Sequence, residues 1–242
     1  MTIIRGISLA TWCFLMQATA LHAQNLSHVG EGKFGVVRLF ISGESWLERT
    51  AQILGIQDGA PARPTPDPVM HGEHAGHAVQ HTGHRIEFWR VDSNARFRLS
   101  QEGLSEAPEM DAVLVERTLA LSQDPRHEDV LILAHGPGDD AENERLIRYI
   151  SERINALHEN YNFNNIKVAT LREDWPEKRD AAQKIVRDYV AAAHASGRTA
   201  LVVPYRVYGF GPYAEVLDGL DYVADETGLV PHPAVAGWTA LP

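Results

Sequence analysis

The apolar positions of this chain form short continuous runs separated by segments of helical periodicity. Three runs lie in the second half, at Asp129–Ala134, Ile166–Leu171 and Thr199–Pro204. Consecutive apolar residues are typical of strands that are buried on both faces of a parallel sheet. Such strands need helices on both sides, so the pattern predicts an α/β fold with three α/β/α layers and a mainly parallel sheet.

Amphipathic segments fill the gaps between these strands and predict helices at Met110–Ser122, Ala141–Tyr161 and Pro176–Ala195. In the second of them, the aliphatic residues lie on one helical face: Leu146, Ile147, Ile150, Ile154 and Leu157. In the third, proline suits the first turn and Gly197 lies just past the end. Ligands of such sheets bind beyond the carboxyl ends of the strands, so functional residues are expected there.

A shorter strand and helix come earlier in the chain. Phe34–Ile41 predicts a buried strand and Glu44–Leu54 a helix. The next segment is rich in proline and histidine, which predicts a disordered linker or a mobile surface excursion. Short strands are expected at Arg85–Arg90 and Ala95–Leu99. The expected organisation is a partial first half at 24–56, a linker at 57–84 and an α/β half at 85–242.

Residues 1–23 have the pattern of a secretory signal. Arg5 supplies a positive charge, a short apolar stretch follows, and Leu21-His22-Ala23 loosely fits a cleavage site. The apolar stretch is shorter than the roughly 20 residues that a spanning helix needs. The mature protein is therefore expected to be periplasmic or secreted, without an integral membrane segment. If the segment is instead a buried strand or helix, a cytoplasmic location is expected.

Charge and cysteine content narrow the function further. The net charge is −10 and no basic run is present, which argues against nucleic acid as a partner. The single cysteine, Cys13, lies in the apparent signal. A mature chain that lacks it has no disulfide, no cysteine-based zinc site and no cysteine nucleophile.

His135 is the first candidate for chemistry. It follows the strand Asp129–Ala134 directly and opens a Gly136-Pro137-Gly138 turn that leads into a helix. The helix N-terminus is expected to disfavour the imidazolium, leaving a neutral ring that can bind a metal or take a proton. The alternative is a histidine that merely caps the turn. The turn lacks phosphate-loop spacing, and the chain has no G-x-S-x-G serine-hydrolase elbow.

The order of these motifs resembles class II tetrapyrrole chelatases of the CbiX, or sirohydrochlorin cobaltochelatase, type. A strand ending in His135-Gly136, followed by Asp139 and then Asn143-Glu144, is similar to their GHGS-x-D…N segment. Val202-Val203-Pro204 resembles their VVPLFL…G segment, and Phe40–Trp46 resembles the matching loop of the other half. The resemblance covers Asp129–Leu220 and part of Phe34–Gly55.

The resemblance implies insertion of Co²⁺, or alternatively Ni²⁺ or Fe²⁺, into a sirohydrochlorin-type macrocycle without an organic cofactor. The second histidine usual in this family is absent from the loop Gly209–Tyr213, and Glu44 stands at the corresponding place in the first half. Glu44 with His135 is therefore a candidate pair for metal binding and proton transfer, unless the second site has been lost. A truncated or divergent member is expected, and a homodimer would rebuild a two-half cleft.

A histidine tract in the linker is a second candidate metal site. It comprises His71, His74, His77, His81 and His84. Flexible imidazole clusters suit Ni²⁺, Cu²⁺, Zn²⁺ or Co²⁺. The alternative is a solvated linker without a ligand.

Five residues near the strand ends carry weaker signals. Glu173-Asp174 follow a strand and could hold a cationic centre, although acidic turns are common there. Arg206 could pair with a carboxylate of a tetrapyrrole, or form a surface salt bridge. Tyr208 and Phe210 could line a flat apolar cleft, or simply pack in the core.

Two hypotheses follow. The first is a chelatase that delivers a divalent metal at His135 to a tetrapyrrole. The second is an exported, non-catalytic protein that keeps the chelatase fold and buffers metal through the histidine tract. The His135 motif favours the first. The apparent signal and the missing second histidine favour the second.

Overall fold

The computed structural model describes residues 33–37, 44–62 and 88–239, with the side chains of 44–46 excepted. By their contacts the described residues divide into two units. Residues 33–36, 47–62 and 88–99 belong to the first unit, and residues 37, 44–46 and 100–239 to the second. The apparent signal at 1–23 and the histidine tract lie outside the described residues.

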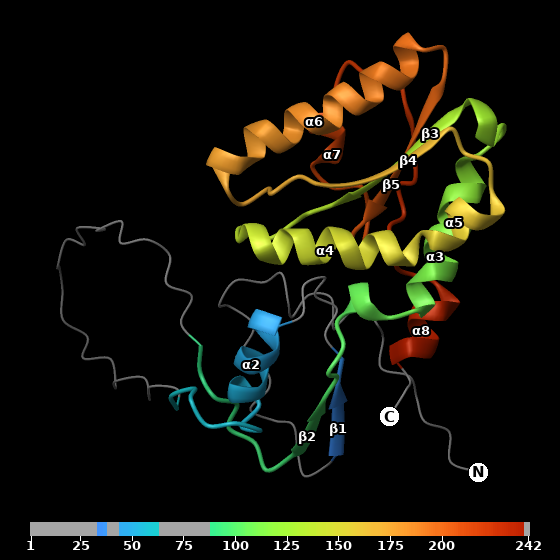
Figure 1. The fold of residues 1–242 in the computed structure, drawn as a ribbon. Helices are drawn as coiled ribbons and strands as arrows, with labels where there is room; N and C mark the ends of the chain where they lie inside the picture. Colours follow the sequence, from blue (N-terminus) through green and yellow to red (C-terminus); the bar gives the residue numbers. More distant parts are fainter. Residues whose placement is uncertain (1–32, 38–43, 63–87, 240–242) are drawn as a thin grey trace, which may run out of the picture. The chain divides into compact units, whose positions relative to one another are not determined.

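The second unit is built on a parallel sheet with the strand order β4-β3-β5-β6. Strands β3, β4 and β5 are labelled in Figure 1. Its strands are β3 (Glu128–Ala134), β4 (Asn165–Thr170), β5 (Thr199–Tyr205) and β6 (Val223–Ala224). Strand β3 lies between β4 and β5, and Ala134 is in register with both Thr170 and Tyr205. The segments that follow these three strands therefore leave the sheet at the same edge.

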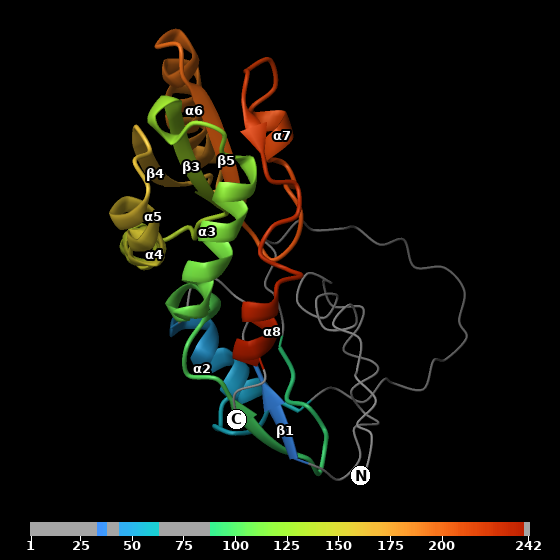
Figure 2. The same ribbon diagram turned by 90° about the vertical axis from the view of Figure 1, so that its right-hand side faces the viewer.

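Helices cover both faces of this sheet, as Figure 2 shows from the side. They are α3 (Glu109–Leu121), α4 (Asp140–Arg153), α5 (Asn155–Asn160), α6 (Pro176–Ala195), α7 (Tyr213–Val216) and α8 (Pro233–Thr239). Two 3₁₀ turns accompany them, η2 (Leu104–Glu106) and η3 (Pro125–His127).

The apolar core divides according to the alternation of side chains along each strand. Val130 and Ile132 of β3 face the cluster formed with α3, α4, α5 and α8. Leu131 and Leu133, the intervening residues, face the cluster formed with α6 and α7. The three-layer α/β fold with a parallel sheet is therefore confirmed.

Two parts of the second unit differ from the sequence prediction. The single helix expected over 141–161 is broken at Ile154, which has φ −98° and ψ 5°, and it continues as α5. The break lets Ile154 and Leu157 both be buried against the sheet. The sequence also gave no indication of α7, β6 or α8, which are short and carry little periodic pattern.

The first unit contains a small parallel sheet of β1 (Lys33–Val36) and β2 (Arg96–Leu99), together with most of α2 (Glu44–Ile53). Because β2 pairs with β1, the division between the two units falls after Leu99. Of the strand expected over Arg85–Arg90, only residues 88–90 are described, and Arg90 there forms an isolated bridge with Ala62.

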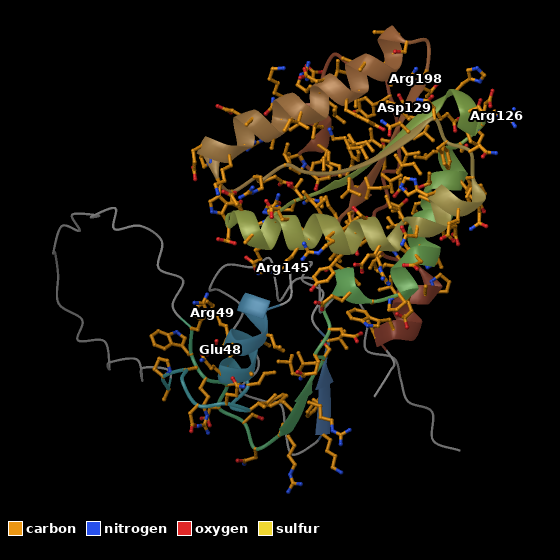
Figure 3. The ribbon with its side chains drawn as sticks, in the orientation of Figure 1. Glu48, Arg49, Arg126, Asp129, Arg145 and Arg198 are labelled. Atoms are coloured by element: carbon orange, nitrogen blue, oxygen red, sulfur yellow. The ribbon has the colours of Figure 1, made fainter. Side chains whose placement is uncertain are left out.

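The amino end of the large sheet is closed by polar contacts of its own. Asp129 is buried, and its carboxylate accepts hydrogen bonds from Asn164 Nδ2 at 2.6 Å and Arg198 Nε at 3.0 Å. Figure 3 shows Asp129 beside Arg198. A buried carboxylate needs such partners, so this pair is best explained as structural support.

Within the part of the chain that the structure describes, none of the helices combines the length and the apolar character that crossing a membrane requires.

The central strand gives a direct test of this architecture. Ile132 is fully buried, so Ile132→Ala should lower the free energy of unfolding by about 2–5 kcal/mol through lost burial and the cavity left behind. Ile185 on α6 is half exposed, and Ile185→Ala should change it by about 0.5 kcal/mol or less. Urea unfolding followed by circular dichroism measures both; similar losses in the two variants would contradict the assignment of β3 to the core.

Candidate functional site

Polar residues from three neighbouring strands gather at the carboxyl edge of the large sheet. His135 follows β3, Glu173 and Asp174 follow β4, and Arg206 follows β5. Contacts between their side chains show that the edge brings them together. This is the edge at which ligands of parallel sheets bind.

Both ring nitrogens of His135 face carboxylates. Nδ1 lies 3.4 Å from Glu173 Oε1, and Nε2 lies 3.0 Å from Asp174 Oδ2. The two acids differ in exposure: the side chain of Glu173 is 12% exposed and that of Asp174 71%. One side of the imidazole therefore faces the protein and the other faces solvent.

Glu173 is fixed in place by a cation from the next strand. Arg206 Nη1 donates a hydrogen bond to Glu173 Oε1 at 3.0 Å, and the guanidinium carbon lies 5.2 Å from the centre of the Tyr213 ring. Burial alone would raise the pKa of the Glu173 carboxyl, but the contacts with His135 and Arg206 outweigh it and hold the pKa below its ordinary value. Glu173 is therefore ionised at neutral pH.

The pKa of His135 is raised above its ordinary value. Burial disfavours the imidazolium, but the contacts with Glu173 and Asp174 more than compensate. The sequence predicted that the helix N-terminus would disfavour the imidazolium, whereas the raised pKa of His135 shows that its carboxylate neighbours favour it. The α4 N-terminus is already capped by Asp139, whose carboxylate accepts a hydrogen bond from the Glu142 N–H at 2.8 Å, and two further carboxylates contact the ring.

The turn that carries His135 is held so closely that only glycine fits on either side of Pro137. Gly136 has φ +78°, and a Cβ there would lie 2.6 Å from Thr170 Cβ. A Cβ on Gly138 would lie 2.2 Å from the Trp175 ring. The buried Asn143 accepts a hydrogen bond from the Thr170 hydroxyl at 2.8 Å, which supports the turn from α4. His135 is thus presented by rigid backbone.

The other predicted site residues are distributed as follows. Arg206 binds Glu173 within the protein, and Phe210 packs against the rings of Tyr213 and Tyr222, with centroids 5.7 and 6.0 Å away. Tyr208 is 74% exposed. Glu44 is the first residue of α2, but its side chain lies outside the described residues, as does the whole histidine tract: His71, His74, His77, His81 and His84.

The sequence contains only weak signals for Glu173 and Asp174 as site residues, and it did not predict Trp175 or Arg172. Trp175 packs edge-on against His135 with ring centroids 6.2 Å apart. The available signal was position: all four residues lie in the segment directly after β4, beside the strand that carries His135.

The arrangement is not a closed metal cage. Among the described residues, no group of three or more His, Cys, Asp or Glu side chains converges on one point. The carboxylates of Glu173 and Asp174 lie on opposite nitrogens of the same ring, so they cannot share one ion with it. The two carboxylates can stabilise a protonated His135. Alternatively, the exposed ring nitrogen could bind another cation in place of its proton.

Comparison with known proteins supports the fold. No protein-family model and no curated protein matches the sequence. A solved structure that resembles it is a multi-domain protein of Deinococcus radiodurans, described as structurally similar to chelatases but with two additional novel domains. The two are 21% identical with a TM-score of 0.51, over 88% of this chain and 41% of the other. This chain therefore spans less than half the length of that protein, and it shares a chelatase-like fold with it.

Proposed function

We propose that His135 binds a divalent metal ion as a substrate and presents it to a sirohydrochlorin-type tetrapyrrole, so that the chain acts as a chelatase. The observation that carries this proposal is the asymmetry around the ring. Nδ1 faces the buried, ionised Glu173, whereas Nε2 faces the exposed Asp174.

This asymmetry matches the way proteins orient metal-binding histidines. Such a histidine usually donates its second N–H to a carboxylate, which fixes the ring and makes the ligating nitrogen more basic. Glu173 is placed to be that carboxylate, with Arg206 holding it. The metal would then replace the proton between Nε2 and Asp174, with the Asp174 carboxylate as a second ligand.

A site with two protein ligands suits an ion that must leave again. Structural zinc sites are closed by four protein ligands, whereas this one would leave positions for water and for the nitrogens of a macrocycle. A nitrogen and an oxygen ligand accept borderline divalent ions, so Co²⁺ is the first choice and Ni²⁺, Fe²⁺ or Zn²⁺ are alternatives. Glu44, the first residue of α2, is proposed as a further ligand, and a homodimer as the assembly that would complete the cleft.

The proposed reaction also releases protons. A tetrapyrrole that takes up a divalent ion loses two pyrrole N–H protons, and a nearby base must accept them. Once the ion has left, His135 Nε2 is free to accept one proton and the Asp174 carboxylate the other, and the exposed Asp174 can pass both to solvent in turn. Tyr208 is exposed in the loop after β5 and is our candidate for contact with the flat macrocycle, while Arg206 and Phe210 support that loop from inside.

The alternative is an exported metal-buffering protein that relies on the histidine tract. It rests on the histidine tract, whose residues lie outside the described part of the chain. A periplasmic or secreted location, proposed from residues 1–23, belongs to this alternative.

Insertion of Co²⁺ into sirohydrochlorin, followed by absorbance, separates the two functions. The wild-type chain should insert the ion faster than the uncatalysed reaction, and His135→Ala should reduce the rate to that background. A variant lacking Met70–His84 should keep most of the rate. His127→Ala is the matched control, because His127 is an exposed histidine that contacts an acid, Asp124, outside the site.

A wild-type rate equal to the background would refute the chelatase. A rate that depends on Met70–His84 but not on His135 would move metal binding to the tract and support the buffering protein.

Metal affinity should depend on pH because protons compete for His135. Co²⁺ affinity, measured by calorimetry, should rise as pH increases through the raised pKa of His135 and then level off. Glu173→Gln should lower that pKa and shift the rise to lower pH, as an NMR titration of the His135 ring would show. Asp174→Asn should lower the pKa as well and also remove a ligand.

The same shift has a consequence for stability. A histidine whose pKa is raised by folding stabilises the native state fully below its unfolded pKa, and this contribution is lost as pH rises through the folded pKa. Glu173→Gln should therefore flatten the decline in stability over this range. Identical His135 titrations in wild type and Glu173→Gln would contradict the assigned role of Glu173.

A further inference from the structure

Arg172 has an unfavourable backbone conformation at the site. It is the last residue before Glu173 and Asp174, and its φ is +57°. Among the described residues, it is the only one other than glycine with a positive φ. A side chain with a Cβ is disfavoured in this left-handed region, where glycine would be accommodated without strain.

The side chain of Arg172 carries a second cost. It is nine-tenths buried, and its Nε atom is buried without a hydrogen-bond partner. A buried unpaired donor is uncommon in native proteins and calls for an explanation. Two unfavourable features at one residue, beside the carboxylates that contact His135, indicate that the arginine serves the site more than the stability of the fold.

The contacts of Arg172 show what it does. Its backbone N–H donates to His135 O at 2.6 Å, and its Nη2 donates to Gly138 O and, at 2.8 Å, to Asp140 Oδ1. It therefore binds both ends of the turn that carries His135. Its own carbonyl accepts a hydrogen bond from the Trp175 N–H at 3.0 Å, which closes the loop that carries the two acids.

We propose that Arg172 is a positioning residue that sets the separation between His135 and its two carboxylates, Glu173 and Asp174. Its left-handed conformation turns the chain immediately after β4, and its guanidinium ties that turn to the His135 turn after β3. The expected effect of Arg172 on metal affinity rests on the function proposed above. Its expected effect on the position of the His135 ring does not.

Lys178 provides a control within the same cluster. Its Nζ donates to the same two acceptors, Gly138 O and Asp140 Oδ1, each at 2.7 Å. Lys178 lies on α6 and not in the loop of the two acids. Both acceptors thus keep a cationic donor when Arg172 is replaced. A loss of Co²⁺ affinity or of ring signals that occurs only in the Arg172 variants therefore shows that Arg172 links the two loops.

The test compares Arg172→Gly, Arg172→Lys and Lys178→Met with the wild type at one fixed pH. Arg172→Gly keeps access to the left-handed conformation and relieves both unfavourable features, so its melting temperature should stay close to that of wild type. Its affinity for Co²⁺ should fall by about 10- to 100-fold, the usual effect of losing a group that orients a metal ligand. The hydrogen-bonded ring N–H signals of His135 in the metal-free NMR spectrum should broaden or disappear.

The other two variants sharpen the result. Lys178→Met should keep both the Co²⁺ affinity and the ring signals, and Arg172→Lys should recover part of each. Wild-type behaviour of Arg172→Gly, or equal losses in Arg172→Gly and Lys178→Met, would overturn the proposal. If Arg172→Gly fails to fold, a folded Arg172→Lys with weakened ring signals supports the proposal, and one with unchanged signals overturns it.

The two proposals can fail separately. If His135→Ala leaves Co²⁺ binding unchanged, the metal function fails, while the ring N–H signals of the metal-free variants still decide the positioning role.

Discussion

Parallel hydrogen bonding of β3 to β4 and β5 places the polar groups of the site next to each other. It brings the carboxyl ends of three strands to one edge, and His135, Glu173, Asp174 and Arg206 meet there although they are far apart in the sequence. The helices on both faces bury the strands and leave that edge available. A slip in register of β4 would separate the acids from the histidine, and a slip of β5 would move Arg206 away from Glu173.

The two acids of the site, Glu173 and Asp174, differ in their exposure to solvent. Glu173 is enclosed and paired with Arg206, so it acts as a fixed negative charge, whereas Asp174 is in contact with water. The imidazole therefore has one enclosed carboxylate partner and one that is exposed to solvent. At the opposite end of the sheet, Asp129 is buried and accepts hydrogen bonds from Arg198 and Asn164.

Much of the second unit could be predicted from the sequence, since continuous apolar runs identify β3, β4 and β5, and proline and glycine mark the ends of α6. The break at Ile154 has no proline or glycine to announce it, and β6 is too short for a period to show. His135 was located correctly from its place after a strand. The direction of its pKa shift could not be predicted, because that direction depends on distances to acids that only the folded register supplies.

Gly138 lies against the ring of Trp175, which belongs to a different loop. Substitutions at these two positions are therefore expected to occur together. A relative with a larger side chain at the first position has to carry a smaller one at the second, or its histidine turn cannot lie against β4. Paired changes at these positions would therefore identify this site in chains whose overall sequence identity is too low for alignment. They would also distinguish proteins that keep the histidine turn from those that share only the sheet.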